Sequence, residues 1–211
     1  MKIGILGSTD VAKSLAHGFL REGHQVKMSS REPSKLVVWV NENGKAASAG
    51  TFAEAARFGE LIVVVVNGIA TESALQMSGS ENFKGKPVID ATNPLDMSGK
   101  LPQLIGGLGT SGGEKVQRLL PGAFVVKAFN TVGHSLFYKP DFSGAMPDMF
   151  LCGDNDRSKL QVSTIIKSFG WNPVDVGGIE TSHYLEALCL VWVHTAIRGN
   201  QWTQAYKLLR K

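Results

Sequence analysis

The sequence predicts an α/β fold in which helices cover both faces of a mainly parallel β-sheet. Short apolar runs alternate with helical segments along most of the 211 residues, which favours parallel strands joined by helical crossovers. Residues 61–66 are six consecutive apolar, mostly β-branched side chains, typical of a strand buried on both faces. The chain also opens with a short apolar run, a glycine and a helical segment. This is the strand–turn–helix unit from which such sheets are built.

The first half of the chain is expected to hold five strands, at residues 3–6, 25–28, 46–48, 61–66 and 86–90. Helices are expected between them, at residues 10–22, 33–41 and 51–59. Gly23 suits the end of the first helix, and Thr51 with Glu54 has the spacing of a capping box at the start of the third.

The second half is expected to hold three more strands, at residues 123–129, 149–152 and 174–176. The helices expected here lie at residues 114–120, 157–169 and 180–197. Residues 95–112 are rich in Gly, Pro and Ser, which indicates a long irregular loop. The last two strands and the last helix therefore predict an extension of the sheet and a helical cap.

The turn after the first strand is suited to a pyrophosphate. A helix that starts directly after a tight turn directs its free N–H groups and the positive end of its dipole at whatever lies over the turn. Thr9 and Ala12 occupy the second and third positions of the usual glycine fingerprint, so the turn alone is also compatible with an ordinary strand–turn–helix. The predicted binding residues here are Gly7, Ser8, Thr9, Asp10 and Val11.

The end of the second strand favours NADP over NAD. In the Rossmann arrangement an Asp or Glu at this position binds the ribose hydroxyls of NAD. This chain has Ser29 and Ser30 there, followed by Arg31 and Lys35. A carboxylate would repel a ribose 2′-phosphate, whereas hydroxyls and cations bind it. We therefore predict that Ser30, Arg31 and Lys35 bind the 2′-phosphate.

The other strand ends offer further binding residues, because ligands of such sheets lie beyond the carboxyl ends of the strands. Small or amide-bearing residues follow the fourth, fifth and sixth strands: Asn67, Gly68, Asn93, Pro94, Ala128 and Asn130. Plain strand–helix turns would also explain the first pair. We divide the chain into a Rossmann domain at residues 1–134, which binds the dinucleotide, and a C-terminal sheet extension with a helical cap at residues 135–211.

No residue stands out as a catalytic acid, base or nucleophile. Lys127 lies at an apolar strand end, which favours a structural ion pair over catalysis, and His134 is a candidate contact for a second substrate. His183, Glu186 and His194 are helically spaced, but no cysteine or carboxylate set completes a metal site. Hydride transfer between two bound cofactors needs alignment and exclusion of water more than an acid–base residue.

Composition excludes several classes of protein. Hydrophobic residues make up 43% and charged residues 19%, ordinary values for a globular protein. The net charge of +4 is small, and no basic stripe interleaved with aromatic residues predicts nucleic-acid binding. Cys152 and Cys189 lie in apolar surroundings and are expected to be buried thiols. No leader or membrane-length span is recognised, so a cytoplasmic protein is expected.

Taken in order, these motifs resemble those of the NADP oxidoreductase family that depends on coenzyme F420, a deazaflavin. The resemblance runs through residues 2–16, Ser30-Arg31 with Lys35, residues 90–95, residues 127–131, residues 152–154, and residues 174–178 followed by residues 184–186. It covers nearly the whole chain, and the cytosolic domains of six-transmembrane ferric reductases are similar too. It implies NADP over the first turn, Asn67 and Ala128 beside the ribose and nicotinamide, and a homodimer formed through the C-terminal helices.

The sequence thus predicts an NADP(H)-dependent oxidoreductase that exchanges hydride with a flavin-like or deazaflavin acceptor, F420, FMN or FAD. A second interpretation is an NADPH-dependent reductase of a small imine or carbonyl compound, with His134 or Asn93 as proton donor. A third is a non-catalytic NADPH sensor, because no catalytic residue is evident. The expected partner is a small-molecule redox acceptor, with no nucleic acid, membrane or metal.

Overall fold

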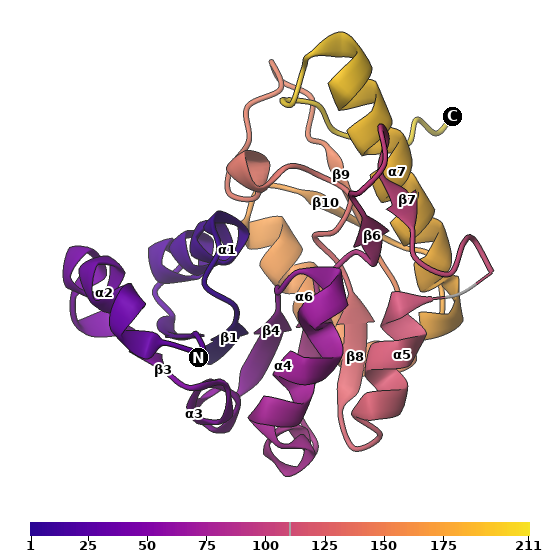
Figure 1. The fold of residues 1–211 in the computed structure, drawn as a ribbon. Helices are drawn as coiled ribbons and strands as arrows, with labels where there is room; N and C mark the ends of the chain where they lie inside the picture. The colour runs from indigo at the N-terminus through magenta and orange to yellow at the C-terminus, as the bar shows by residue number, and fades with distance from the viewer. Residues whose placement is uncertain (110) are drawn as a thin grey trace.

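The computed structural model describes residues 1–109 and 111–211, and its centre is a six-stranded parallel sheet (Figure 1). The strand order is β3-β2-β1-β4-β5-β8, and each neighbouring pair is parallel. The strands are β1 (Lys2–Leu6), β2 (Gln25–Ser29), β3 (Ala47–Gly50), β4 (Leu61–Val64), β5 (Pro87–Asp90) and β8 (Phe124–Lys127). The strand order reverses between β1 and β4, as in a doubly wound sheet, which confirms the predicted fold class.

The helices pack on both faces of this sheet. They are α1 (Asp10–Arg21), α2 (Val37–Asn43), α3 (Phe52–Phe58), α4 (Thr71–Ser78), α5 (Gly112–Leu119) and α6 (Asp156–Ser168), while α7 (Ser182–Gly199) contacts α5 and the C-terminal strands instead. Short 3-10 turns lie at Pro33–Leu36, Gly44–Ala46, Gly68–Ala70, Ser80–Phe83, His134–Leu136 and Ile179–Thr181. Side chains from α1 and α6 share one buried apolar cluster with Ile3 and Ile5, and those from α3, α4 and α5 share the other with Leu6.

The strands of the C-terminal extension form their own small sheet beside the main one. Strands β9 (Asp148–Leu151) and β10 (Asn172–Asp175) pair in parallel as a separate two-stranded sheet. Lys127 and Cys152 connect it to β8 through reciprocal backbone hydrogen bonds of 2.9 and 3.1 Å. In Figure 1, α7 runs alongside β9 and β7 at the upper right of the molecule. The predicted extension is therefore present, and in the described part of the chain its strands share one bridge with the main sheet.

Three local predictions need correction. Helix α4 was not predicted, because only Ala74 and Leu75 mark its apolar face and no capping residue precedes it. The predicted loop at residues 95–112 contains a short antiparallel hairpin, β6 (Leu95–Asp96) and β7 (Gln103–Leu104). The predicted helix at 33–41 is a 3-10 turn followed by a short α-helix. Within the described residues, no helix is both long and apolar enough to span a membrane.

Candidate functional site

Two connected hollows lie beyond the carboxyl ends of the parallel strands. Hollow A, of about 360 Å³, is lined by Gly7, Ser8, Thr9, Ser30, Arg31, Glu32, Lys35, Phe52, Val66, Asn67, Ala70, Ser73, Ala74 and Met77. Hollow B, of about 400 Å³, is lined by Thr9, Val11, Val65, Val66, Asn67, Gly68, Ala91, Thr92, Asn93, Leu95, Met97, Phe129, Asn130, Val132, Gly133, His134, Phe137 and Cys189. They share Thr9, Val66 and Asn67, so a single elongated ligand can occupy both.

The turn after β1 brings the backbone close to hollow A. Gly7 has φ of +146°, and a Cβ there would lie 2.8 Å from the Val65 carbonyl oxygen, so this position requires glycine. Thr9 precedes α1, but its side chain makes no capping hydrogen bond. Ala12 is fully buried, which explains why alanine is accepted at the third glycine position. The start of α1 is thus free to bind an anion.

The far end of hollow A carries the predicted phosphate-binding residues. Ser30 Oγ accepts a hydrogen bond from the Glu32 backbone N–H at 3.1 Å. Lys35 Nζ pairs with the Glu32 carboxylate at 2.9 Å, and both side chains are largely exposed. Arg31 makes no ion pair within residues 1–109 and 111–211. Sequence reasoning missed Glu32, whose position three residues before Lys35 was the available signal.

Hollow B is closed on one side by two interlocked amide side chains. Asn93 Nδ2 donates to the Asn130 carbonyl oxygen, and Asn130 Nδ2 donates to Asn93 Oδ1, both at 2.9 Å. Asn130 Nδ2 also donates to the Leu185 carbonyl oxygen of α7 at 3.1 Å. Gly68 packs directly on the Asn93 carbonyl, where any Cβ would collide. These contacts join the ends of β4, β5 and β8 to the C-terminal helix.

Three predicted site residues line neither hollow. Ala128 is fully buried, and its backbone N–H donates to the Asp90 carbonyl oxygen at 3.1 Å. Asp10 is exposed and pairs with Lys13 at 3.3 Å, and Pro94 lines a separate hollow between α4 and α5. Their roles stay predictions. Sequence reasoning missed other lining residues: Ser73, Met77, Leu95, Met97 and Cys189 come from α4, the hairpin and α7, which were predicted poorly or not linked to the site.

A buried charged cluster borders hollow B, because one of its hydrogen-bond acceptors is the carbonyl oxygen of Thr92, which lines that hollow. Lys127 Nζ contacts Asp90 Oδ2 at 3.0 Å, Glu186 Oε1 at 2.8 Å and the Thr92 carbonyl oxygen at 2.6 Å. The side chains of Lys127, Asp90 and Glu186 are all 0% exposed. Burial alone would lower the pKa of Lys127, but the two carboxylates outweigh it and raise the pKa. The predicted structural ion pair is confirmed.

Two further polar residues border hollow B. His134 lies at its rim, with Nδ1 3.2 Å from Ser14 Oγ. Cys189 is buried in its wall, and burial raises the pKa of this thiol to about 12. Both cysteines are free, as predicted.

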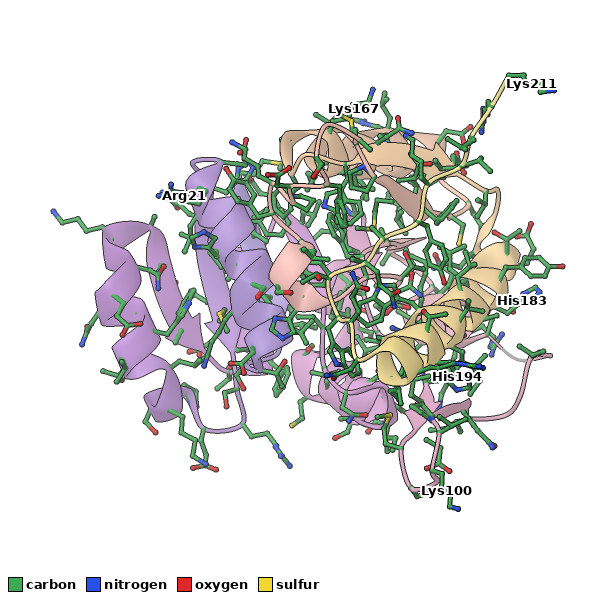
Figure 2. All side chains as sticks on the ribbon, turned by 90° about the horizontal axis from the view of Figure 1, so that it is seen from above. Arg21, Lys100, Lys167, His183, His194 and Lys211 are labelled. Carbon is green, nitrogen blue, oxygen red and sulfur yellow. The ribbon has the colours of Figure 1, made fainter. Side chains whose placement is uncertain are left out.

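Both histidines of α7 contact backbone carbonyl oxygens. His183 Nδ1 lies 2.6 Å from the Glu180 carbonyl oxygen, and His194 Nε2 lies 3.0 Å from that of Pro102. Figure 2 shows both residues on α7, well apart along the helix. In the described part of the chain, no three His, Cys, Asp or Glu side chains gather in a way that could hold a metal ion.

This sheet order, with a glycine turn and hollows along its carboxyl edge, defines the class of dinucleotide-binding Rossmann proteins. The model of the protein family described as "NADP oxidoreductase coenzyme F420-dependent" matches residues 2–94 of this chain. The crystal structure of a candidate F420-dependent NADP reductase from Arthrobacter sp. FB24 is 33% identical and superposes with a TM-score of 0.94, covering 100% of both chains. The chain therefore belongs to the family of F420-dependent NADP oxidoreductases.

Other relatives agree with this family. An F420-dependent NADP reductase from Methanothermobacter marburgensis is 28% identical and covers 94% of both chains. Metalloreductase STEAP3 from Rattus norvegicus is 29% identical over 90% of this chain, which spans only 36% of the metalloreductase. A reductive aminase from Aspergillus terreus, solved with NADPH, shares the fold at 16% identity and a TM-score of 0.69. The prediction of an NADP-dependent oxidoreductase is thus confirmed at the level of the family.

Proposed function

We propose that this protein transfers hydride between NADP(H) and a planar, flavin-like or deazaflavin acceptor such as F420, FMN or FAD. The single observation that carries the proposal is the continuity of hollows A and B through Thr9, Val66 and Asn67. Hollow A is lined at one end by Arg31, which has no ion-pair partner among the residues that the structure describes, and hollow B has an apolar wall at the other end. A dinucleotide lying across both would have its 2′-phosphate at Arg31 and its nicotinamide in hollow B.

The residues present fit NADP(H). Gly7 lets the backbone approach the pyrophosphate, and the uncapped start of α1 supplies N–H groups to it. Ser30, Arg31 and Lys35 offer a hydroxyl and two cations to the 2′-phosphate, while Glu32 opposes it by holding Lys35. Asn67 lines both hollows, so it can contact the ribose of a dinucleotide at the place where the ligand passes from one hollow to the other. Asp10, Pro94 and Ala128 would act through the backbone around these groups.

The proposed hydride transfer depends on how the nicotinamide ring and the acceptor ring are aligned. When bound, NADPH supplies the hydride at its nicotinamide ring. Val65, Phe129 and Phe137 give hollow B an apolar surface that excludes water from a ring placed there. The Asn93–Asn130 pair is held on both sides by backbone contacts, so it can orient a bound ring without moving. No side chain has to exchange a proton for hydride to pass between two stacked rings.

The acceptor is tested by mixing the protein with NADPH and each acceptor separately and recording NADPH absorbance. F420, FMN or FAD should be reduced rapidly. NADPH deuterated at either face of C4 should transfer label to F420 from one face only, because hollow B holds the ring in one orientation. Slow, unsaturable oxidation with every planar acceptor would contradict the proposal.

One observation favours a second candidate, the reduction of a small imine or carbonyl compound. His134 lies at the rim of hollow B with Nδ1 facing Ser14, which leaves Nε2 available to donate a proton to a reduced carbonyl oxygen or imine nitrogen. NADPH oxidation by a panel of cyclic imines and ketones, abolished in His134→Gln, would support this candidate over the first.

The division of the chain at residues 134 and 135 and the homodimer also belong to the proposal. Helix α7 exposes Tyr184 and Val191, two turns apart on one face, by 61% and 51%, which supports an apolar contact between two copies. Light scattering coupled to size exclusion should give twice the mass of the chain. A monomer at micromolar concentration would contradict a stable dimer.

A further inference from the structure

We propose that the buried cluster of Lys127, Asp90 and Glu186 makes hollow B favour the oxidised, cationic nicotinamide ring over the reduced, neutral one. This inference rests on the proposed function, because it takes hollow B as the nicotinamide site. It assigns to the cluster an electrostatic role that an ion pair holding the fold together would not have.

The hydrogen bonds of the cluster define its charge. Asp90 accepts from the Thr92 backbone N–H at 2.9 Å, from the Thr92 hydroxyl at 2.7 Å and from Lys127 Nζ at 3.0 Å. Glu186 accepts from the backbone N–H groups of Gly112 and Gly113, both at 3.1 Å, and pairs with Lys127. Among the described residues, each of these hydrogen-bond partners is a donor, which suits the acceptor-only oxygens of a carboxylate. Two carboxylates and one ammonium leave a net charge of −1.

The cluster lies next to the atoms that line hollow B. Asp90 is followed directly by Ala91 and Thr92, which both line it. Glu186 lies one helical turn before Cys189, which lines the same hollow from α7. All three charged side chains are fully buried, so water screens them poorly. Their net charge therefore acts on whatever ring occupies the hollow.

The expected size of the effect follows from two opposing influences. A buried negative charge attracts the positive ring of NADP⁺ and leaves the neutral ring of NADPH nearly unaffected. The N-terminal N–H groups of α5 offset part of that charge through their contact with Glu186. We therefore expect the cluster to favour binding of NADP⁺ over NADPH by about tenfold, which corresponds to about 1.4 kcal/mol.

The test is the ratio of two dissociation constants, for NADP⁺ and for NADPH, measured by calorimetric titration of the whole protein. Glu186→Gln removes one charge from the cluster and keeps the size of the side chain. The ratio of the NADP⁺ constant to the NADPH constant should rise about tenfold over the unsubstituted protein. Asp90→Asn should shift the ratio in the same direction, and it replaces Glu186→Gln if circular dichroism finds that variant unfolded.

The matched control is Asp148→Asn. Asp148 is also a buried carboxylate, paired with Lys207 at 3.1 Å, but it lines neither hollow A nor hollow B. Asp148→Asn should lower the free energy of unfolding and leave the ratio of the NADP⁺ and NADPH dissociation constants unchanged. An unchanged ratio in Glu186→Gln and Asp90→Asn, or equal weakening of both nucleotides, overturns the inference. If the unsubstituted protein binds neither nucleotide, the proposed function itself fails.

Discussion

Replacing Arg31 by alanine gives a direct test of the 2′-phosphate site. Arg31 is the cation of hollow A that has no ion-pair partner in the described residues, whereas Lys35 is held by Glu32 at 2.9 Å. Arg31→Ala should therefore weaken NADPH binding more than Lys35→Ala does. NADH lacks the 2′-phosphate, so its affinity should barely change in either variant.

The magnitude follows from the exposure of the site. A charge-assisted hydrogen bond from arginine to phosphate contributes about 1.5–3 kcal/mol when shielded from water. Arg31 is exposed, so solvent and salt reduce this to about 1–2 kcal/mol, or roughly 5- to 30-fold in the dissociation constant. Glu32→Gln removes a repulsive charge and releases Lys35, so it should tighten NADPH binding by about 0.5–1 kcal/mol.

The assay is fluorescence titration of NADPH and NADH at low and high salt. The difference between Arg31→Ala and the unsubstituted protein should shrink as salt is added, because the interaction is exposed. Equal losses of affinity for NADPH and NADH would refute the assignment of the 2′-phosphate to Arg31. Tighter NADH binding without any change for NADPH in Glu32→Gln would refute the account of Glu32.

Three other predictions concern hollow B and buried groups of the fold around it. Gly68→Ala forces a Cβ into the facing carbonyl and displaces a wall of the site, so the hydride-transfer rate measured by stopped flow should fall roughly 10- to 100-fold. Lys127→Met leaves two buried carboxylates without their cation and should lower the free energy of unfolding by about 3–5 kcal/mol in urea denaturation. Burial raises the pKa of Cys152 to about 11 and that of Cys189 to about 12, so a maleimide at pH 8 should label neither thiol until the protein is unfolded.

The sequence predicted the parts of the fold whose signals are local and strong. The apolar run at residues 61–66 is the centre of the sheet, and the capping box of Thr51 and Glu54 forms at the start of α3 as expected. Helix α4 was missed because it begins without a capping side chain and presents only a short apolar face. The hairpin of β6 and β7 was missed because each strand has two residues, too few for a periodic pattern.

The two ends of the candidate site differed in how far they could be predicted. Gly7 and the residues from Ser30 to Lys35 belong to two turns whose residue types and spacing in the sequence indicated hollow A. Hollow B brings together the ends of several strands, the hairpin and α7. Cys189 reaches it only because α7 docks onto the sheet, and nothing near residue 189 in the sequence signals that contact.

The docking of α7 depends on groups far apart in the sequence. Glu186 meets Lys127 from β8 and the N-terminus of α5, while the Leu185 carbonyl holds Asn130. The hairpin is tied to the same helix through His194. In the proposed arrangement, the 2′-phosphate end of the nucleotide at hollow A and the nicotinamide end with its acceptor at hollow B thus rest on largely separate parts of the fold. Substitutions on α7 and the hairpin should change which acceptor is reduced while leaving the preference for NADPH over NADH intact, because Arg31 and its turn touch neither element.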